Sequence, residues 1–126
     1  GAGAAGNPLR DPNNILSKRS VYFEFDSFTV SEQYKPIIEA HAKYLAANRN
    51  ARATLQGHGD ERGAREYNIA LGQKRADAVK RMMTLLGVQE VQIETVSFGE
   101  EKPKNMGHDE TAWAENRRAD IIYSGE

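Results

Sequence analysis

Apolar and polar residues recur along the chain with two periods, one typical of strands and one typical of helices. Residues 21–25 are aromatic and β-branched, a composition that favours a strand. Residues 53–58 and residues 119–123 are also predicted to be strands. Residues 91–96 alternate between apolar and polar side chains, which predicts a strand with one buried face. The sequence therefore predicts four strands.

The segment between the first two strands predicts a helix. Its apolar residues share one face at helical spacing, and they are Ile38, Ala42 and Leu45. Thr29 or Ser31 is a suitable cap for its start, and Pro36 is tolerated in a first turn. We expect this helix to end near Asn48.

A longer helix is expected between the second and third strands. It ends near Leu86, with Gly87 in the position where a left-handed residue commonly follows a helix. Asn68 is a candidate N-cap, with residues 62–67 forming a turn before it. The expected apolar stripe consists of Leu71, Ala78, Val79, Met82 and Leu86. Arg75 falls on this stripe, which is unusual for a guanidinium.

The order of elements is strand, helix, strand, helix, strand, short helix near residues 111–115, strand. This order predicts an α+β fold, a two-layer sandwich in which a mixed, roughly four-stranded sheet is covered by two main helices. The first three strands are expected to be parallel, because helices connect them. Residues 1–18 are rich in small residues, Pro and Asn without periodicity, and we expect them to form a flexible tether before a domain of residues 19–126.

Composition removes several classes of function. The chain has 126 residues and a net charge of -1, whereas a general nucleic-acid clamp carries a clear basic excess, so we expect no nucleic-acid partner. No apolar run approaches the roughly 18–20 residues that span a bilayer, and we expect this chain to be soluble in water. The absence of cysteine excludes disulfides, thiolate metal sites and cysteine nucleophiles.

The charged segment after the second predicted strand carries the candidate chemistry. Residues 57–63 combine three glycines with Asp60, Glu61 and Arg62. If Asp60, Asp26 and Arg75 converge, they form a pocket with both signs of charge, which would suit a zwitterion. The alternative is that Asp60 caps the segment that follows it and that Arg75 makes a structural salt bridge. The residue pattern alone leaves both open.

Two histidines raise the alternative of a metal site. His58 and His108 each lie beside carboxylates, and together they would supply enough ligands for zinc. Neither has a hydrolase spacing, so we expect both to brace loops by hydrogen bonds and expect no metal and no cofactor. We expect Trp113 to pack the short helix against the sheet, and one of Arg117 and Arg118 to be paired while the other is solvated.

Several motifs resemble the OmpA-like peptidoglycan-binding domains. They are Phe-Glu-Phe-Asp at residues 23–26, Gly-His-Gly-Asp-Glu-Arg-Gly at 57–63, Glu-Tyr-Asn at 66–68, Ala-Leu-Gly at 70–72, Arg-Ala at 75–76, Ser-Phe-Gly-Glu-Glu-Lys-Pro at 97–103, Gly-His-Asp-Glu-Thr-Ala-Trp at 107–113 and Asn-Arg-Arg-Ala at 116–119. The resemblance covers roughly residues 20–123. Within the family, the Asp-Glu-Arg-Gly and Gly-His-Asp-Glu-x-Ala-Trp elements favour the branch of peptidoglycan-associated lipoproteins over porin or flagellar-stator relatives.

This resemblance implies a domain that is not an enzyme and binds the meso-diaminopimelate of the peptidoglycan stem peptide. By position, Asp60 receives the ligand's ammonium group and Arg75 its carboxylate. The remaining ligand-binding residues that the family implies are Phe25, Asp26, Ser27 and Leu71. Relatives usually have Thr or Ala where this chain has Gly59, which removes no charged contact.

The resemblance also implies a place in the cell. A peptidoglycan-associated lipoprotein anchors the outer membrane to the cell wall within the Tol–Pal system, with TolB and other Tol proteins as partners. We therefore expect the periplasmic face of the outer membrane, reached through an N-terminal lipid. The cysteine that carries the lipid is missing from this chain. The remaining alternatives are an anchor domain of a porin or stator, and a metal-dependent wall hydrolase.

Overall fold

The computed structural model describes residues 7–126, and its centre is a single four-stranded sheet. The strands are β1 (Ser20–Tyr22), β2 (Ala53–His58), β3 (Ile93–Gly99) and β4 (Arg118–Tyr123), in the order β1-β4-β2-β3. β2 and β3 are parallel, while β4 runs antiparallel to both β1 and β2. The mixed sheet and the parallel direction of the first three strands are as predicted.

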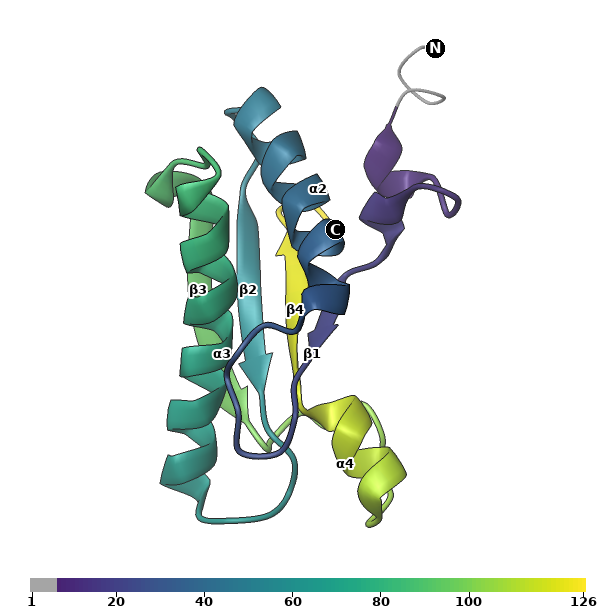
Figure 1. Cartoon of the computed structure of the whole chain (residues 1–126), viewed down its shortest axis with the longest axis vertical. Coiled ribbons are helices and arrows are strands. Elements are labelled where there is room, and N and C mark those ends of the chain that lie inside the picture. Colours follow the sequence, from purple (N-terminus) through teal and green to yellow (C-terminus); the bar gives the residue numbers. More distant parts are fainter. Residues whose placement is uncertain (1–6) are drawn as a thin grey trace.

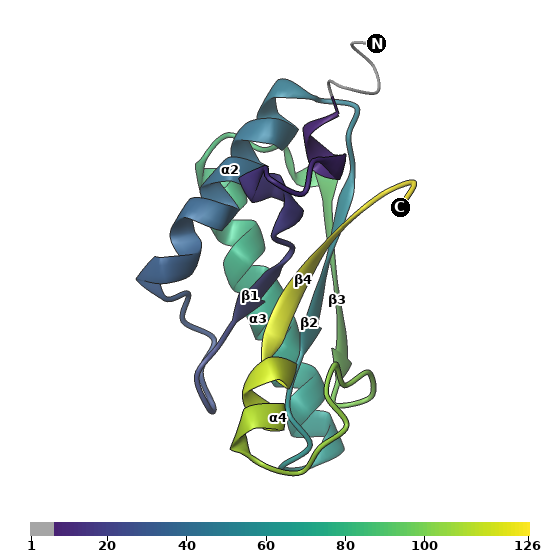
Figure 2. The ribbon, with the colours of Figure 1, turned by 90° about the vertical axis from the view of Figure 1, so that its right-hand side faces the viewer.

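Two long helices cover one face of this sheet (Figures 1 and 2). They are α2 (Lys35–Ala47) and α3 (Arg65–Leu85), while the short α4 (Glu110–Asn116) lies at one end of the sheet. Four 3-10 turns complete the described elements: η1 (Pro8–Arg10), η2 (Ile15–Ser17), η3 (Glu32–Tyr34) and η4 (Glu90–Gln92). The predicted two-layer α+β class is confirmed. In the part of the chain that the structure describes, no helix is both long and apolar enough to cross a membrane.

The core fills the space between the two layers. The apolar side chains that are fully or almost fully buried there include Val21, Ile38, Ala42, Leu45, Leu55, Val79, Met83, Ile93 and Ile121. The predicted face of α2 is therefore correct. The predicted face of α3 is only partly correct, because Leu86 is exposed and Ala78 and Met82 are half-buried. The buried face is displaced around the helix and includes Arg75.

The start of α3 also differs from expectation. The helix begins at Arg65 after Ala64, so Asn68 lies inside it and is not its N-cap. The Asn68 side chain is buried and donates hydrogen bonds to the Arg62 carbonyl at 2.9 Å and to Glu100 Oε1 at 2.8 Å. Asn68 therefore ties the loop before α3 to the loop after β3.

The N-terminal segment is partly described. The expected tether includes residues 1–6, which lie outside the described residues. Residues 7–18 contact the domain, because the Leu16 side chain is buried and Arg19 donates a hydrogen bond to the Leu9 carbonyl at 3.1 Å. Arg19 also pairs with Glu126 at 2.6 Å, close to the other end of the chain. The boundary at residue 18 stays a prediction.

A close approach of two backbones sets the height of α3 above the sheet. A Cβ atom added to Gly57 in β2 would overlap the Gly72 carbonyl of α3, and one added to Gly72 would overlap the Ser97 side chain. Only glycine allows this contact at both positions. The contact brings the first turns of α3 down onto the end of β2, which is where the candidate site lies.

Candidate functional site

Three segments meet at the end of the sheet where β2 finishes and α3 begins. They are the loop after β1, the loop between β2 and α3, and the first turns of α3. Together they enclose a small cavity of about 20 Å³, lined by Phe25, Asp26, Asp60, Arg62, Tyr67, Asn68, Leu71 and Arg75. Five of the six predicted ligand residues therefore line one cavity, and the carbonyl of the sixth, Ser27, accepts a hydrogen bond from Arg75. Their role in binding stays a prediction.

Arg75 is the most deeply buried charge in this region. Its side chain is fully buried, and it donates to the carbonyls of Ser27 at 2.8 Å, His58 at 2.9 Å and Glu24 at 3.2 Å. Among residues 7–126, Arg75 makes no salt bridge, so the structural pair considered from the sequence is not formed there. Burial, followed by the nearby positive charge of Arg117, lowers the pKa of Arg75 to about 10, so it is still charged at neutral pH. Three of its five N–H groups are used in these bonds.

Asp60 is buried but fully engaged. Its Oδ2 lies 2.7 Å from Arg62 Nη2 and 3.4 Å from Arg117 Nη1, and its Oδ1 accepts from the Arg62 backbone N–H at 2.9 Å. Burial acts to raise the pKa of Asp60, but the hydrogen bonds and charge of Arg62 outweigh it, so the pKa is lowered. Asp60 therefore caps the turn that follows it, as one expectation had it. It also lines the same cavity as Arg75, as the other expectation had it.

The other lining residues differ in exposure and strain. Asp26 has a φ of 56°, a left-handed conformation that costs about 1–2 kcal/mol for most residues and that Asp tolerates better than most. Leu71 is buried at 8% exposure, whereas the Phe25 ring is 60% exposed at the mouth of the cavity. The cavity thus has a fixed, charged floor and one aromatic edge open to solvent.

Two arginines at the start of β4 correct an expectation: Arg117 directly precedes the strand and Arg118 is its first residue. Arg117 and Arg118 are both buried, although one was expected to be solvated. Arg117 pairs with Glu110 at 2.8 Å and donates to the Phe23 carbonyl at 2.9 Å, while Arg118 pairs with Asp120 at 2.9 Å. Arg117 therefore supports the Asp60 side chain from behind.

Trp113 faces the loop before α3 and not the sheet, contrary to expectation. Its ring lies 4.1 Å from the Arg62 guanidinium, and its Nε1 donates to Glu61 Oε2 at 2.7 Å. Glu61 also accepts from His108 Nδ1 at 2.8 Å. The hydrogen bond from Trp113 and, to a smaller extent, the one from His108 lower the pKa of Glu61. The contact joins α4 to the mouth of the cavity.

The two histidines are far from forming a metal centre. His108 is exposed and bonded to Glu61, as expected of a bracing histidine. His58 is buried, makes no side-chain hydrogen bond and stacks on Phe98, so its expected bracing role is wrong. Its nearest carboxylate oxygen is Asp120 Oδ2 at 3.6 Å. Within residues 7–126, no three His, Asp or Glu side chains are grouped to hold a metal ion.

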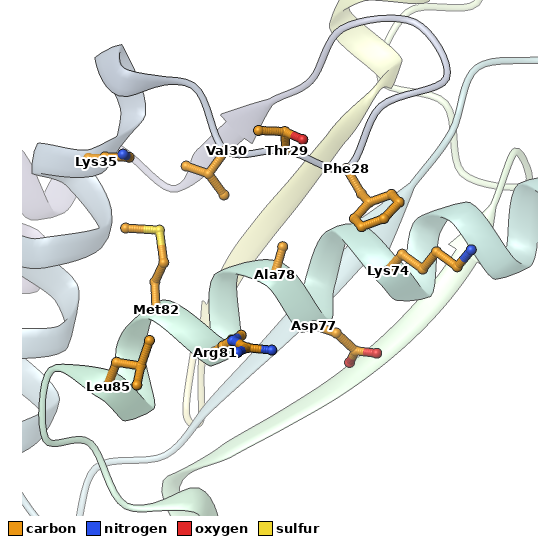
Figure 3. Close-up of a pocket in the computed structure, with 10 residues that line it drawn as sticks. All are labelled: Phe28, Thr29, Val30, Lys35, Lys74, Asp77, Ala78, Arg81, Met82 and Leu85. Carbon is orange, nitrogen blue, oxygen red and sulfur yellow. The ribbon is translucent and has the colours of Figure 1, made fainter.

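A larger groove of about 580 Å³ lies on the other side of the loop after β1 (Figure 3). Phe28, Val30, Met82 and Leu85 form its apolar lining, and Lys74 lies at its edge. Two of the five stripe residues that were expected in the core, Ala78 and Met82, therefore line this groove. None of the six predicted ligand residues lines it, so cavity size does not locate the predicted site.

Comparison with known proteins assigns the chain to the same family that its motifs resemble. The family model described as "OmpA family" matches residues 22–117, which is most of the chain. The chain belongs to the OmpA family. Its curated relatives include the peptidoglycan-associated lipoproteins of Pasteurella multocida, at 51% identity over 82% of this chain and 69% of that protein, and of Haemophilus influenzae, at 51% over 82% and 68%.

Solved structures agree with the fold. The crystal structure of the peptidoglycan-associated lipoprotein from Burkholderia pseudomallei has 56% identity and a TM-score of 0.91, covering 93% of this chain and 99% of that one. The C-terminal domain of Helicobacter pylori MotB has a TM-score of 0.77, covers 86% of each chain and is 20% identical, so it shows a shared fold alone. The predicted resemblance to the peptidoglycan-associated lipoproteins is confirmed.

Sequence reasoning missed the residues that fill and support the cavity. Arg62 and Arg117 contact Asp60 directly. Glu110 pairs with Arg117, and Trp113 packs on Arg62. None of these four was named as a site residue. One signal was available for Arg62. An Asp two residues before a backbone N–H commonly forms a side-chain turn, and this brings the second residue back over the carboxylate.

Proposed function

We propose that this domain binds peptidoglycan noncovalently, through the meso-diaminopimelate of the stem peptide. The observation that carries the proposal is that a buried carboxylate, Asp60, and a buried guanidinium, Arg75, line one cavity. Membership in a family whose relatives are called peptidoglycan-associated lipoproteins supports this choice of ligand.

The two charges match the end of the diaminopimelate side chain. That end carries an ammonium group and a carboxylate on the same carbon. Asp60 would receive the ammonium, and the two N–H groups of Arg75 that are not bonded to carbonyls would receive the carboxylate. Leu71 and Phe25 would contact the methylene chain. A lysine side chain offers the ammonium alone and should bind more weakly.

The chemistry proposed is recognition and not catalysis. Asp60 has a lowered pKa and Arg75 a pKa of about 10, so both are charged across the neutral range. Neither is held near neutral pH, which is where a general acid or base is most effective. Binding should therefore vary little between pH 6 and pH 8.

We further propose that this binding anchors the outer membrane to the cell wall within a Tol–Pal system. TolB and other Tol proteins would then be partners, and the domain would act at the periplasmic face of the outer membrane. In this proposal, an N-terminal lipid holds the protein at that membrane. The support for this extension is the similarity to the peptidoglycan-associated lipoproteins.

Calorimetric titration with the tripeptide L-Ala-D-Glu-meso-diaminopimelate tests the binding proposal. Asp60→Asn keeps the acceptor for the Arg62 N–H but removes the charge, so affinity should fall at least about tenfold. Asp77→Asn is the matched control, because Asp77 is an exposed α3 residue outside the cavity. A tripeptide with Lys in place of diaminopimelate should bind more weakly. Equal affinity of the Asp60→Asn variant and the unchanged protein would overturn the proposal.

A further inference from the structure

The Asp60 carboxylate already holds a cation, and this cation comes from the same chain. Arg62 Nη2 lies 2.7 Å from Asp60 Oδ2, and Arg62 Nε lies 3.2 Å from Oδ1, so the guanidinium bonds to both oxygens. Asp60 is 5% exposed at its side chain and Arg62 is 34% exposed. The guanidinium therefore covers the carboxylate on its solvent side.

Two aromatic rings flank this guanidinium. The Arg62 Cζ atom is 4.3 Å from the centre of the Phe25 ring and 4.1 Å from that of Trp113. Cations are attracted to the faces of such rings, Trp most strongly. The bond from Trp113 to Glu61 fixes the indole in this orientation. A carboxylate and two rings thus form a ready-made environment for an organic cation.

The cavity cannot take a ligand while Arg62 is in place. Its volume of about 20 Å³ has room for about one water molecule and is far below the roughly 300 Å³ or more of pockets that hold small molecules. Arg75 is fixed by bonds to three carbonyls, but the Arg62 side chain bonds to none. Arg62 also belongs to the loop between β2 and α3, outside any helix or strand. Of the two guanidinium groups at this cavity, Arg62 is the one that can leave.

We propose that Asp60, Phe25 and Trp113 form a subsite for an organic cation, which Arg62 occupies in the absence of ligand and from which the ligand's ammonium group displaces it. This inference rests on the proposed function for the identity of the ligand. It adds Trp113 as a wall of the binding site and makes Arg62 an internal competitor. The displaced guanidinium regains water at the surface, which limits the cost of the exchange.

The subsite can be tested without peptidoglycan. Trp113 is the single tryptophan of the chain, so its fluorescence reports on this position. In the Arg62→Ala variant, methylguanidinium at millimolar concentration should give a saturable change in fluorescence. The unchanged protein should give no saturable change, because its own guanidinium fills the subsite. Adding Asp60→Asn to Arg62→Ala should abolish the response. A response that is absent from Arg62→Ala, or equal in all three proteins, overturns the subsite.

Titration with the diaminopimelate tripeptide tests the competition. Removing the competitor in Arg62→Ala should tighten binding by about 3- to 10-fold, the range set by a partly exposed ion pair with cation–π support. Arg62→Gln should act in the same direction. Arg65→Ala is the control, because Arg65 is a neighbouring exposed arginine that pairs with Glu101 instead. Equal or weaker binding of both Arg62 variants, with unchanged thermal unfolding, overturns the competitor role.

The two failures are distinguishable. If the unchanged protein and the Arg62 variants all fail to bind the tripeptide, the proposed function is wrong. The methylguanidinium response of Arg62→Ala is then a separate measurement, and it alone decides whether Asp60, Phe25 and Trp113 accept a cation.

Discussion

Arg75 joins three segments of the fold, and its replacement should destabilise the protein before any ligand is considered. Its hydrogen bonds to Glu24, Ser27 and His58 carry a charged donor, so each is worth about 1.5–3 kcal/mol. Against this, burial lowers the pKa of Arg75 to about 10, which corresponds to about 3 kcal/mol lost on burying the charge. We expect Arg75→Met to lower the free energy of unfolding by about 3 kcal/mol.

Urea denaturation followed by circular dichroism measures this loss. The midpoint should fall while the slope of free energy against urea stays the same, since the surface exposed on unfolding is unchanged. Arg75→Lys should be nearly as destabilising, because one ammonium group cannot span three carbonyls. Arg81→Met, on the exposed side of α3, is the control and should cost less than about 0.5 kcal/mol. A loss below about 1 kcal/mol for Arg75→Met would refute the reasoning.

Two further predictions concern the support of the site. Gly72→Ala should lower the free energy of unfolding by about 1–3 kcal/mol, because the new methyl group overlaps the Ser97 side chain and also meets the Gly57 backbone. A melting temperature equal to that of the unchanged protein would contradict this. Burial, followed by the charge of Arg118, lowers the pKa of His58 to about 4. In the unfolded chain His58 binds a proton near pH 6.5, whereas in the folded protein it does so only near pH 4. The contribution of His58 to the free energy of unfolding is therefore fully present above pH 6.5 and declines as the pH falls towards 4. Melting temperatures measured from pH 4 to pH 8 should show this decline, and His58→Phe should make it shallower; equal slopes in both proteins would count against it.

The elements of the fold were largely predictable, because periodicity is a local property of the sequence. Residues 53–58 were expected to be a strand and are β2, and the φ of 103° at Gly87 confirms the left-handed residue expected after α3. The buried face of α3 was misplaced for a physical reason. Pattern reasoning counts apolar residues, but this face also buries Asn68, Gly72 and Arg75, which are polar or lack a side chain.

From the residue pattern alone, only the charged residues Asp26, Asp60 and Arg75 of the site could be predicted. Asp60 and Arg75 were expected to converge, and they do line one cavity. The contacts of Arg62 with Phe25 and Trp113 join residues that are far apart in the sequence. No periodicity encodes such contacts, since they depend on the direction that each loop takes after its strand or helix ends.

The placement of the N-terminal segment relative to the cavity has a mechanical consequence. η1 and η2 lie at one end of the long axis of the molecule, and the loops that enclose the cavity lie at the other (Figure 1). A pull between residue 7 and a ligand held at Asp60 would therefore run nearly along the strands. The antiparallel bonds between β1 and β4 would then bear the load together in shear, and would not open one after another. Such a geometry resists tension better than the small size of β1 suggests.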